Sequence, residues 1–362
     1  MGEGLIVASD GTRTAAGGAV ANPSNNPVPS DRNPFPLSAK PSAKPAPIRP
    51  QVAVIQENIE KTLKGKSEVV KNALIGLLAR GHLLFEDVPG TGKTTLAQLL
   101  SRSIDVGFSR IQFTSDLLPS DILGVGVFDQ ARGEFEFKPG PLFAHIVLAD
   151  ELNRTTPKTQ SALLEAMNSA QVTIDKTTHD LPQPFLVIAT QNPVEFHGTF
   201  PLPKSQMDRF MMRLHLGYPA ADEEMTVLRE QRVAGDLSGV KAVVGADEVL
   251  DMQRAVDDVL VDESLLRYMV AIAGATRDHP EVRLGVSTRG TLALRRAAQA
   301  KAWYEGRDYC VPDDAKSLVA PVLAHRIQLS RERDTWGAAP GRLHEDEERL
   351  LARIVESIPV PV

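Results

Sequence analysis

The sequence has little of what disulfide-stabilised, membrane-embedded or nucleic-acid-binding proteins need. Its one cysteine, Cys310, cannot form a disulfide within the chain, which fits a reducing compartment and a buried, inert thiol. No apolar run reaches the roughly 18 residues that a membrane-spanning helix requires, and the N-terminus lacks the apolar core of a signal peptide. A net charge of −6 gives no basic excess of the kind that nucleic-acid binders usually show. We therefore expect a cytoplasmic protein without a membrane span.

Most of the chain has an ordinary globular composition, with 42% hydrophobic and 24% charged residues. Its 362 residues are enough for roughly two domains of about 150 residues each. Residues 1–50 differ, because Pro, Ala, Ser, Gly and Asn dominate there without any apolar period. We predict a disordered tail over 1–50, and binding of a partner by this tail stays open as an alternative.

The rest of the chain divides by its apolar spacing. Over 51–218, helical patterns alternate with short apolar runs such as HIVLAD and FLVIAT, which predicts an α/β domain with a parallel sheet. Within it, residues at about 121–143 alternate apolar and polar side chains around Ala131-Arg132-Gly133, which predicts an inserted β-hairpin. Over 219–362 only helical spacing remains, so we predict a smaller all-helical domain.

A phosphate-binding loop is predicted by LLFEDVPGTGKTTLAQLL, residues 83–100. The P-loop pattern G-x-x-x-x-G-K-[ST] requires a strand before the loop and a helix after it, and both are predicted here. Backbone N–H groups of such a loop hold phosphate oxygens, its lysine reaches the β- and γ-phosphates, and its threonine coordinates Mg²⁺. The residues assigned to nucleotide binding are Pro89, Gly90, Thr91, Gly92, Lys93, Thr94 and Thr95.

Asp87 departs from this pattern, because it stands where the first glycine is required. That glycine serves backbone geometry rather than phosphate chemistry, and aspartate tolerates a turn or a left-handed conformation better than most residues with a Cβ atom. We interpret Asp87 as a tolerated turn residue. A degenerate, inactive loop is the alternative.

Two further strand ends carry polar side chains that suit nucleotide hydrolysis. The run HIVLAD ends in Asp150-Glu151, where the first acid can hold Mg²⁺ and the second can activate the attacking water. The run FLVIAT leads to Asn192, whose amide can orient that water or contact the γ-phosphate. Either strand end could instead be a solvated polar turn.

Together these motifs resemble the AAA+ ATPases, and within that superfamily the MoxR family. The resemblance is carried by DELNRTTPKTQSALLEAM, by ATQNPVEFHGTFPLPKSQMDRFMMRL and by GVSTRGTLALRRAAQAKAWYEGRDY. The predicted hairpin is similar to the insertion that this group carries within its second helix. The resemblance covers about residues 52–335 and leaves out the proline-rich tail.

The resemblance implies roles for matching residues. Asn192 corresponds to sensor 1 and Arg289, in the helical lid, to the sensor-2 arginine. Arg209 is the best candidate for an arginine finger that reaches a neighbouring subunit's site, and Arg154 could share that duty. The adenine pocket is expected near Gly65 and the lid. Each arginine could instead be an ordinary surface charge.

The implied function is ATP hydrolysis with Mg²⁺ in a homo-oligomeric ring, expected to be a hexamer, that remodels, assembles or matures partner proteins. The chain has no DxSxS run, so a von Willebrand A-domain partner would be a separate protein.

Three alternatives are a nucleic-acid motor or loader, a nucleotide-switched scaffold and a magnesium-chelatase-like subunit. The mixed charges of the hairpin disfavour the first, and the acid pair Asp150-Glu151 disfavours the second. The sequence identifies no client.

Overall fold

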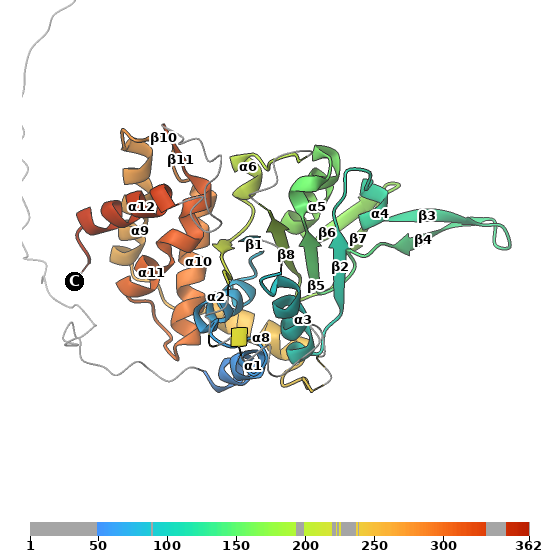
Figure 1. Cartoon of the computed structure of the whole chain (residues 1–362), viewed down its shortest axis with the longest axis horizontal. Helices are drawn as coiled ribbons and strands as arrows, with labels where there is room; N and C mark the ends of the chain where they lie inside the picture. The colour runs from blue at the N-terminus through green and yellow to red at the C-terminus, as the bar shows by residue number, and fades with distance from the viewer. Residues whose placement is uncertain are drawn as a thin grey trace, which may run out of the picture. The chain divides into compact units, whose positions relative to one another are not determined.

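The computed structural model describes residues 49–87, 90–192, 199–218, 222, 224–225, 237, 239–330 and 345–361 (Figure 1). These residues belong to one compact unit, Pro45–Val362. The tail predicted over 1–50 lies outside the described residues except for its last two. Pro50 already begins the first helix, α1 (Pro50–Glu60), so the predicted boundary at 50 is late by at least one residue. Proline suits this first helical position because its missing N–H would have no partner there.

A five-stranded sheet with the order β2-β5-β8-β1-β9 forms the centre of the ATPase part, and every neighbouring pair in it is parallel. The predicted parallel sheet is therefore confirmed. Its central strands are almost entirely buried, as expected where helices cover both faces of a parallel sheet. The strands are β1 (Leu83–Glu86), β2 (Phe108–Gln112), β5 (Ile146–Asp150), β8 (Leu186–Gln191) and β9 (Met212–Leu214).

Alternate residues of each strand enter two different hydrophobic clusters. Leu83 and Phe85 pack with the helices α1, α2 (Ser67–Leu78) and α3 (Lys93–Ile104), whereas Leu84 packs with α5 (Pro157–Ser169). This follows from the two-residue period of a strand, which sends successive side chains to opposite faces. The short helices α4 (Pro119–Leu123), α6 (Lys204–Met207) and η1 (Leu152–Arg154) complete this part of the chain.

The C-terminal part is helical, as predicted, with one departure. Its helices are α8 (Ala246–Asp257), α9 (Glu263–Asp278), α10 (Thr288–Tyr304), α11 (Pro312–Leu323), η2 (Ala324–Arg326) and α12 (Glu345–Ser357). The departure is a small antiparallel sheet of β10 (Val282–Leu284) and β11 (Gln328–Leu329). The prediction of an all-helical domain is wrong in this respect, because strands of two or three residues are too short to show a period.

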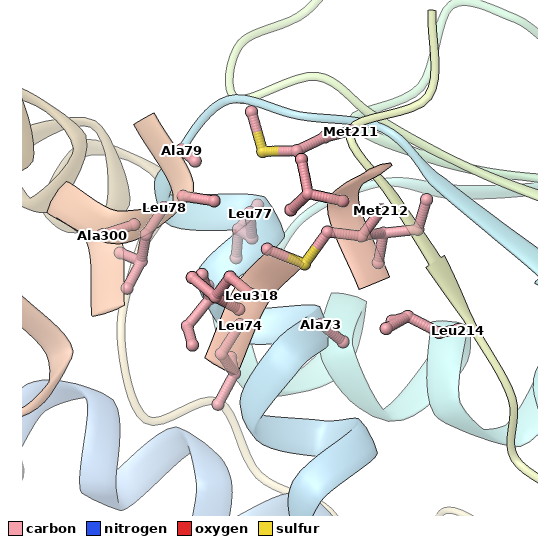
Figure 2. Close-up of a cluster of buried hydrophobic side chains, with 14 of the residues drawn as sticks. Ala73, Leu74, Leu77, Leu78, Ala79, Met211, Met212, Leu214, Ala300 and Leu318 are labelled. Carbon is pink, nitrogen blue, oxygen red and sulfur yellow. The ribbon is translucent and has the colours of Figure 1, made fainter. Parts of the chain in front are cut away.

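The first large cluster runs without a break from the sheet into the helical lid. Figure 2 shows Leu74, Leu77 and Leu78 of α2 close to Met212 and Leu214 of β9 and to the lid residues Ala300 and Leu318. Because all of these side chains are buried, movement of the lid against the ATPase part exposes apolar surface. Within the described parts of the chain, no helix combines the length and apolarity needed to cross a bilayer.

The predicted β-hairpin is confirmed. It consists of β3 (Gly124–Asp129) and β4 (Glu134–Pro139), paired antiparallel in continuous register and projecting from the sheet (Figure 1). A second hairpin was not predicted. It pairs β6 (Gln171–Ile174) with β7 (Thr177–Asp180) across a two-residue turn, whose residues Asp175 and Lys176 both have positive φ. The turn has no glycine, so its sequence lacks the usual hairpin signal.

His82, just before β1, is a buried histidine with a fixed tautomer. Its Nδ1 accepts a hydrogen bond from the Val187 N–H at 3.0 Å, so the proton is on Nε2, which donates to the Met167 carbonyl at 2.9 Å. Burial lowers the pKa of His82 from its ordinary 6.5 to about 4. Protonation would place a second N–H against the Val187 N–H, which explains why the neutral form is favoured.

We therefore expect acid to destabilise the fold. The contribution of neutral His82 is complete above pH 6.5 and is lost as the pH falls toward 4, because the unfolded chain binds the proton first. The loss is about 3 kcal/mol in free energy of unfolding over this range, and buried His325, whose pKa is also lowered, adds to it. Urea unfolding between pH 8 and pH 4.5 measures it. His82→Gln should flatten this dependence, and an unchanged slope would contradict the assignment.

Candidate active site

A cavity of about 300 Å³ opens at the carboxyl edge of the sheet, where β1, β2, β5 and β8 end. Its lining residues are Asp87, Gly90, Gly92, Lys93, Thr94, Thr95, Arg110, Gln112, Asp150, Glu151, Thr190, Gln191 and Asn192. The structure thus brings together the predicted loop, the acid pair and Asn192, although they are far apart in the sequence. Thr91 is buried and does not line the cavity, and Pro89 lies outside the described residues.

The loop ends in a helix that begins at the cavity. Gly90 and Gly92 have φ of +85° and +99°, a region that strains residues with a Cβ atom, and α3 starts at the next residue, Lys93. The first N–H groups of a helix have no partner within it and attract anions. This end of α3 can therefore hold phosphate oxygens.

Lys93 lies within this anion-attracting end. Its Nζ donates to the Asp87 carbonyl at 3.1 Å. Burial lowers the pKa of Lys93, and the charges of Asp87, Asp150 and Glu151 oppose that shift. The ammonium is thus partly desolvated, and a charge in such a setting interacts more strongly with a phosphate than it does in water.

Asp87 has a different role from the predicted one. It is not among the residues with positive φ, and only 3% of it is exposed. Its carboxylate accepts hydrogen bonds from two backbone N–H groups, of Leu216 at 2.6 Å and of Gly217 at 3.1 Å. Asp87 therefore ties the start of the phosphate loop to the segment after β9. A glycine at this position could not make these bonds.

The acid pair is held by its neighbour strand β8. Thr190 Oγ1 donates to Asp150 Oδ1 at 2.6 Å and accepts from the Glu151 N–H at 2.8 Å. Glu151 has a left-handed backbone, with φ of 57° and ψ of 47°, which costs energy for a residue other than glycine. This bend turns the chain from β5 into η1 directly at the cavity. Thr190 thus fixes the two acids relative to each other.

Arg110 and Gln112, on the other neighbour strand β2, complete the contacts of the acids. Arg110 binds Asp150 Oδ2 through Nη2 at 2.7 Å and Nε at 3.2 Å, and Gln112 Nε2 donates to Glu151 Oε2 at 2.8 Å. These two residues were not predicted from the sequence. Their signal was two long polar side chains two positions apart in the strand RIQF, which places both on one face of the strand next to β5.

The residues at the cavity suit a magnesium ion bound together with a nucleotide. Asp150 and Thr94 offer hard oxygen ligands, which Mg²⁺ prefers. Within the described ranges, no group of three His, Cys, Asp or Glu side chains is arranged to hold a metal on its own. An ion here would therefore take its remaining ligands from phosphate oxygens and water, which is how Mg²⁺ is commonly held.

The remaining predicted residues lie outside the cavity. Arg154 pairs with Glu151 of its own chain, with 3.2 Å between Nε and Oε2. Arg209 and Arg289 do not line the cavity. Asp208, the residue before Arg209, binds Arg326 of the lid. Gly65, with φ of +70°, lies between α1 and α2 and does not line it either. None of these four residues therefore lines the cavity that would hold the nucleotide in the described part of the chain.

Comparisons with known proteins agree with this geometry. Residues 82–212 match a family described as "ATPase family associated with various cellular activities (AAA)", and residues 274–347 match the "AAA lid domain". The chain is similar to a Cytophaga hutchinsonii protein of solved crystal structure, provisionally named an ATPase, with a TM-score of 0.77 and 37% identity, covering 86% of this chain and 95% of that one.

Three curated relatives place the chain more closely. "Uncharacterized protein YeaC" of Bacillus subtilis is 45% identical, over 87% of this chain and 96% of its own length. "Chaperone MoxR1" of Mycobacterium tuberculosis is 34% identical, over 96% and 93%. "Protein MoxR" of Paracoccus denitrificans is 31% identical, over 74% and 85%. With the phosphate loop, the acid pair and the lid in one compact unit, the chain belongs to the MoxR family of AAA+ ATPases.

Proposed function

We propose that this chain hydrolyses ATP with Mg²⁺ in a homo-oligomeric ring, a hexamer, and uses the energy to remodel, assemble or mature partner proteins. The observation that carries the proposal is that Lys93 and the acid pair Asp150-Glu151 line the same cavity. These groups have complementary tasks in phosphoryl transfer, and the sheet brings them to one edge.

Each group has a definite task in this proposal. The loop N–H groups and Lys93 bind the phosphates, and Thr94 with Asp150 holds the metal. When bound, Mg²⁺ supplies charge neutralisation at the transferred phosphoryl group. Glu151 accepts the proton of the attacking water, for which its carboxylate must leave Gln112 and Arg154. The amide of Asn192, at the wall of the same cavity, orients that water.

The charge that develops at the phosphate requires a further cation, and we assign it to Arg209 of a neighbouring subunit. Arg154 is the weaker candidate because it already pairs with Glu151 in its own chain. Arg209 is half-buried and does not reach its own cavity, as expected for a residue that serves another subunit. An arginine supplied in this way accelerates hydrolysis by about 10³ to 10⁵. A site completed by a neighbour makes activity depend on assembly.

The action on partner proteins is supported by the relative from Mycobacterium tuberculosis, which is named a chaperone and is matched over 93% of its length. A von Willebrand A-domain protein encoded separately is the proposed adaptor, and the cytoplasm is the proposed location. No observation on the described residues favours a nucleic-acid substrate over a protein.

Mixing two inactive variants tests the ring and the finger together. Arg209→Ala keeps the water-activating acid, and Glu151→Gln keeps the arginine, so a mixed ring contains some interfaces with both groups intact. We expect each variant alone to be inactive and the mixture to regain activity, measured as phosphate release at fixed total protein. EDTA should abolish the recovered activity.

A mixture of Arg154→Ala with Glu151→Gln is the matched control. It should show no such recovery if Arg154 acts only within its own chain. Recovery in this mixture and none with Arg209→Ala would reassign the finger to Arg154. The ring would be refuted if neither mixture recovered activity and if the activity per molecule of the parent protein did not change with protein concentration.

A further inference from the structure

Arg326, at the end of η2 in the lid, is buried against the ATPase part of the chain. Its side chain is 2% exposed, and its Nε donates to Asp208 Oδ1 at 2.8 Å. Burial lowers the pKa of Arg326 to about 10, and the charge of Asp208 opposes that shift. The guanidinium therefore stays protonated at neutral pH. A charge buried this deeply is retained only where its hydrogen bonds are well satisfied.

Three further hydrogen bonds of Arg326 hold the backbone on both sides of Arg209. Nη2 donates to the carbonyls of Asp208 at 3.2 Å and Phe210 at 2.7 Å, and Nη1 donates to that of Met211 at 3.1 Å. One lid side chain thus binds three carbonyls within four consecutive residues. Arg209 lies inside this segment, so the direction in which its side chain leaves the backbone depends on Arg326.

The same aspartate also connects to the lid helix that carries Arg289. Ser287 Oγ donates to the Asp208 carboxylate, at 2.9 and 3.1 Å from its two oxygens, and accepts from the Gly290 N–H as the cap of α10. A Cβ atom at Gly290 would lie 2.8 Å from Arg326 Cδ, so the helix approaches the guanidinium closely at this glycine. Arg289 is the second residue of α10.

We propose that Arg326, Asp208 and Ser287 form a positioning unit that couples the lid to ATP hydrolysis by setting the orientation of Arg209 and Arg289 together. The unit joins one residue of the ATPase part to two of the lid. Neither the finger segment nor the start of α10 can therefore move without breaking a bond to the other. This proposal rests on the proposed function, since it assumes that Arg209 and Arg289 contact the phosphates of the nucleotide.

Ser287 is the cleanest place to test the unit, because it is exposed and contributes little packing. Ser287→Gly removes the bond to Asp208, while glycine caps a helix nearly as well as serine. Ser287→Thr keeps both the bond and the cap. We expect Ser287→Gly to lower kcat about ten- to hundred-fold, with KM within about two-fold and Tm within about 2 °C of the parent protein. Ser287→Thr should restore kcat.

Arg326→Lys is the second variant, and the lid provides a matched control for it. Arg307 binds the buried carboxylate of Asp314 at 2.6 and 2.7 Å, near the opposite end of α10, about 24 Å away along the helix. Arg307→Lys therefore removes a largely buried guanidinium, whose side chain is 16% exposed, from the lid at a distance from Arg209. Both variants should lower Tm, and only Arg326→Lys should lower kcat in addition. Should Arg326→Lys fail to fold, the Ser287 variants decide.

Equal kcat for Ser287→Gly and Ser287→Thr would overturn the positioning unit, as would equal loss of kcat in both lysine variants. A non-hydrolysable ATP analogue should raise the Tm of the parent protein, of Ser287→Gly and of Ser287→Thr alike, because the unit acts on turnover and not on binding. Failure of the proposed function is a different result, in which the parent protein itself hydrolyses no ATP, and both proposals then fail.

Discussion

Glu151→Gln will leave ATP binding intact and lower ATP turnover by about 10² to 10⁴. Glutamine has nearly the same shape and can keep the contact with Gln112, but its amide cannot accept a proton from water. Asp150 and Lys93 are untouched, so the phosphates and the metal should bind as before. Binding of a fluorescent ATP analogue and phosphate release at saturating ATP, measured on the same preparation, separate the two steps.

Glu165→Gln, on the exposed face of α5, is the control for loss of one negative charge, and it should hydrolyse ATP at the parent rate. If Glu151→Gln retained parental turnover, Glu151 could not be the water-activating acid. Because this variant should stay in its ATP-bound state, it also offers a route to the client. Partner proteins that are held only in the ATP-bound ring should be captured with it.

Asp87→Gly will destabilise the protein although it restores the consensus pattern of the phosphate loop. The buried carboxylate accepts hydrogen bonds from the Leu216 and Gly217 N–H groups. Glycine has no side chain, so both N–H groups would lose their acceptor. The loss of such a pair of bonds costs about 2–4 kcal/mol in free energy of unfolding. The loop would also lose its link to the segment after β9, so ATP affinity should fall. Urea unfolding and ATP titration measure the two effects.

Asp87→Asn is the matched variant, since its one amide oxygen can replace only one of the two carboxylate acceptors. We expect its stability to lie between those of the parent protein and Asp87→Gly. An increase in stability or in ATP affinity for Asp87→Gly would instead support the interpretation of Asp87 as a tolerated turn residue.

The local elements were predictable because local spacing determines them. Apolar runs of four to seven residues between helical patterns predicted each strand of the sheet, and alternation predicted the hairpin of β3 and β4. The hairpin of β6 and β7 was missed because Asp175-Lys176 adopts a turn that usually requires glycine or asparagine. The pair β10 and β11 was missed because its strands are too short to carry a pattern.

The candidate site was predictable where a motif carries the chemistry within one segment. Lys93, Asp150, Glu151 and Asn192 follow apolar strands, and the carboxyl ends of parallel strands lie at one edge of a sheet. Arg110 and Gln112 were not predicted, because only the pairing of β2 with β5 puts them beside the acids.

The sequence by itself determined the phosphate loop, the acid pair, the alternation of the central strands with helices, and the family that these motifs resemble. Only the tertiary structure decided what Asp87 and Arg326 do. Their partners lie far along the chain: Leu216 is 129 positions from Asp87, and Asp208 is 118 positions from Arg326. Hydrogen bonds of this kind depend on where folding brings a carboxylate, a guanidinium and backbone groups together, and no local spacing records that.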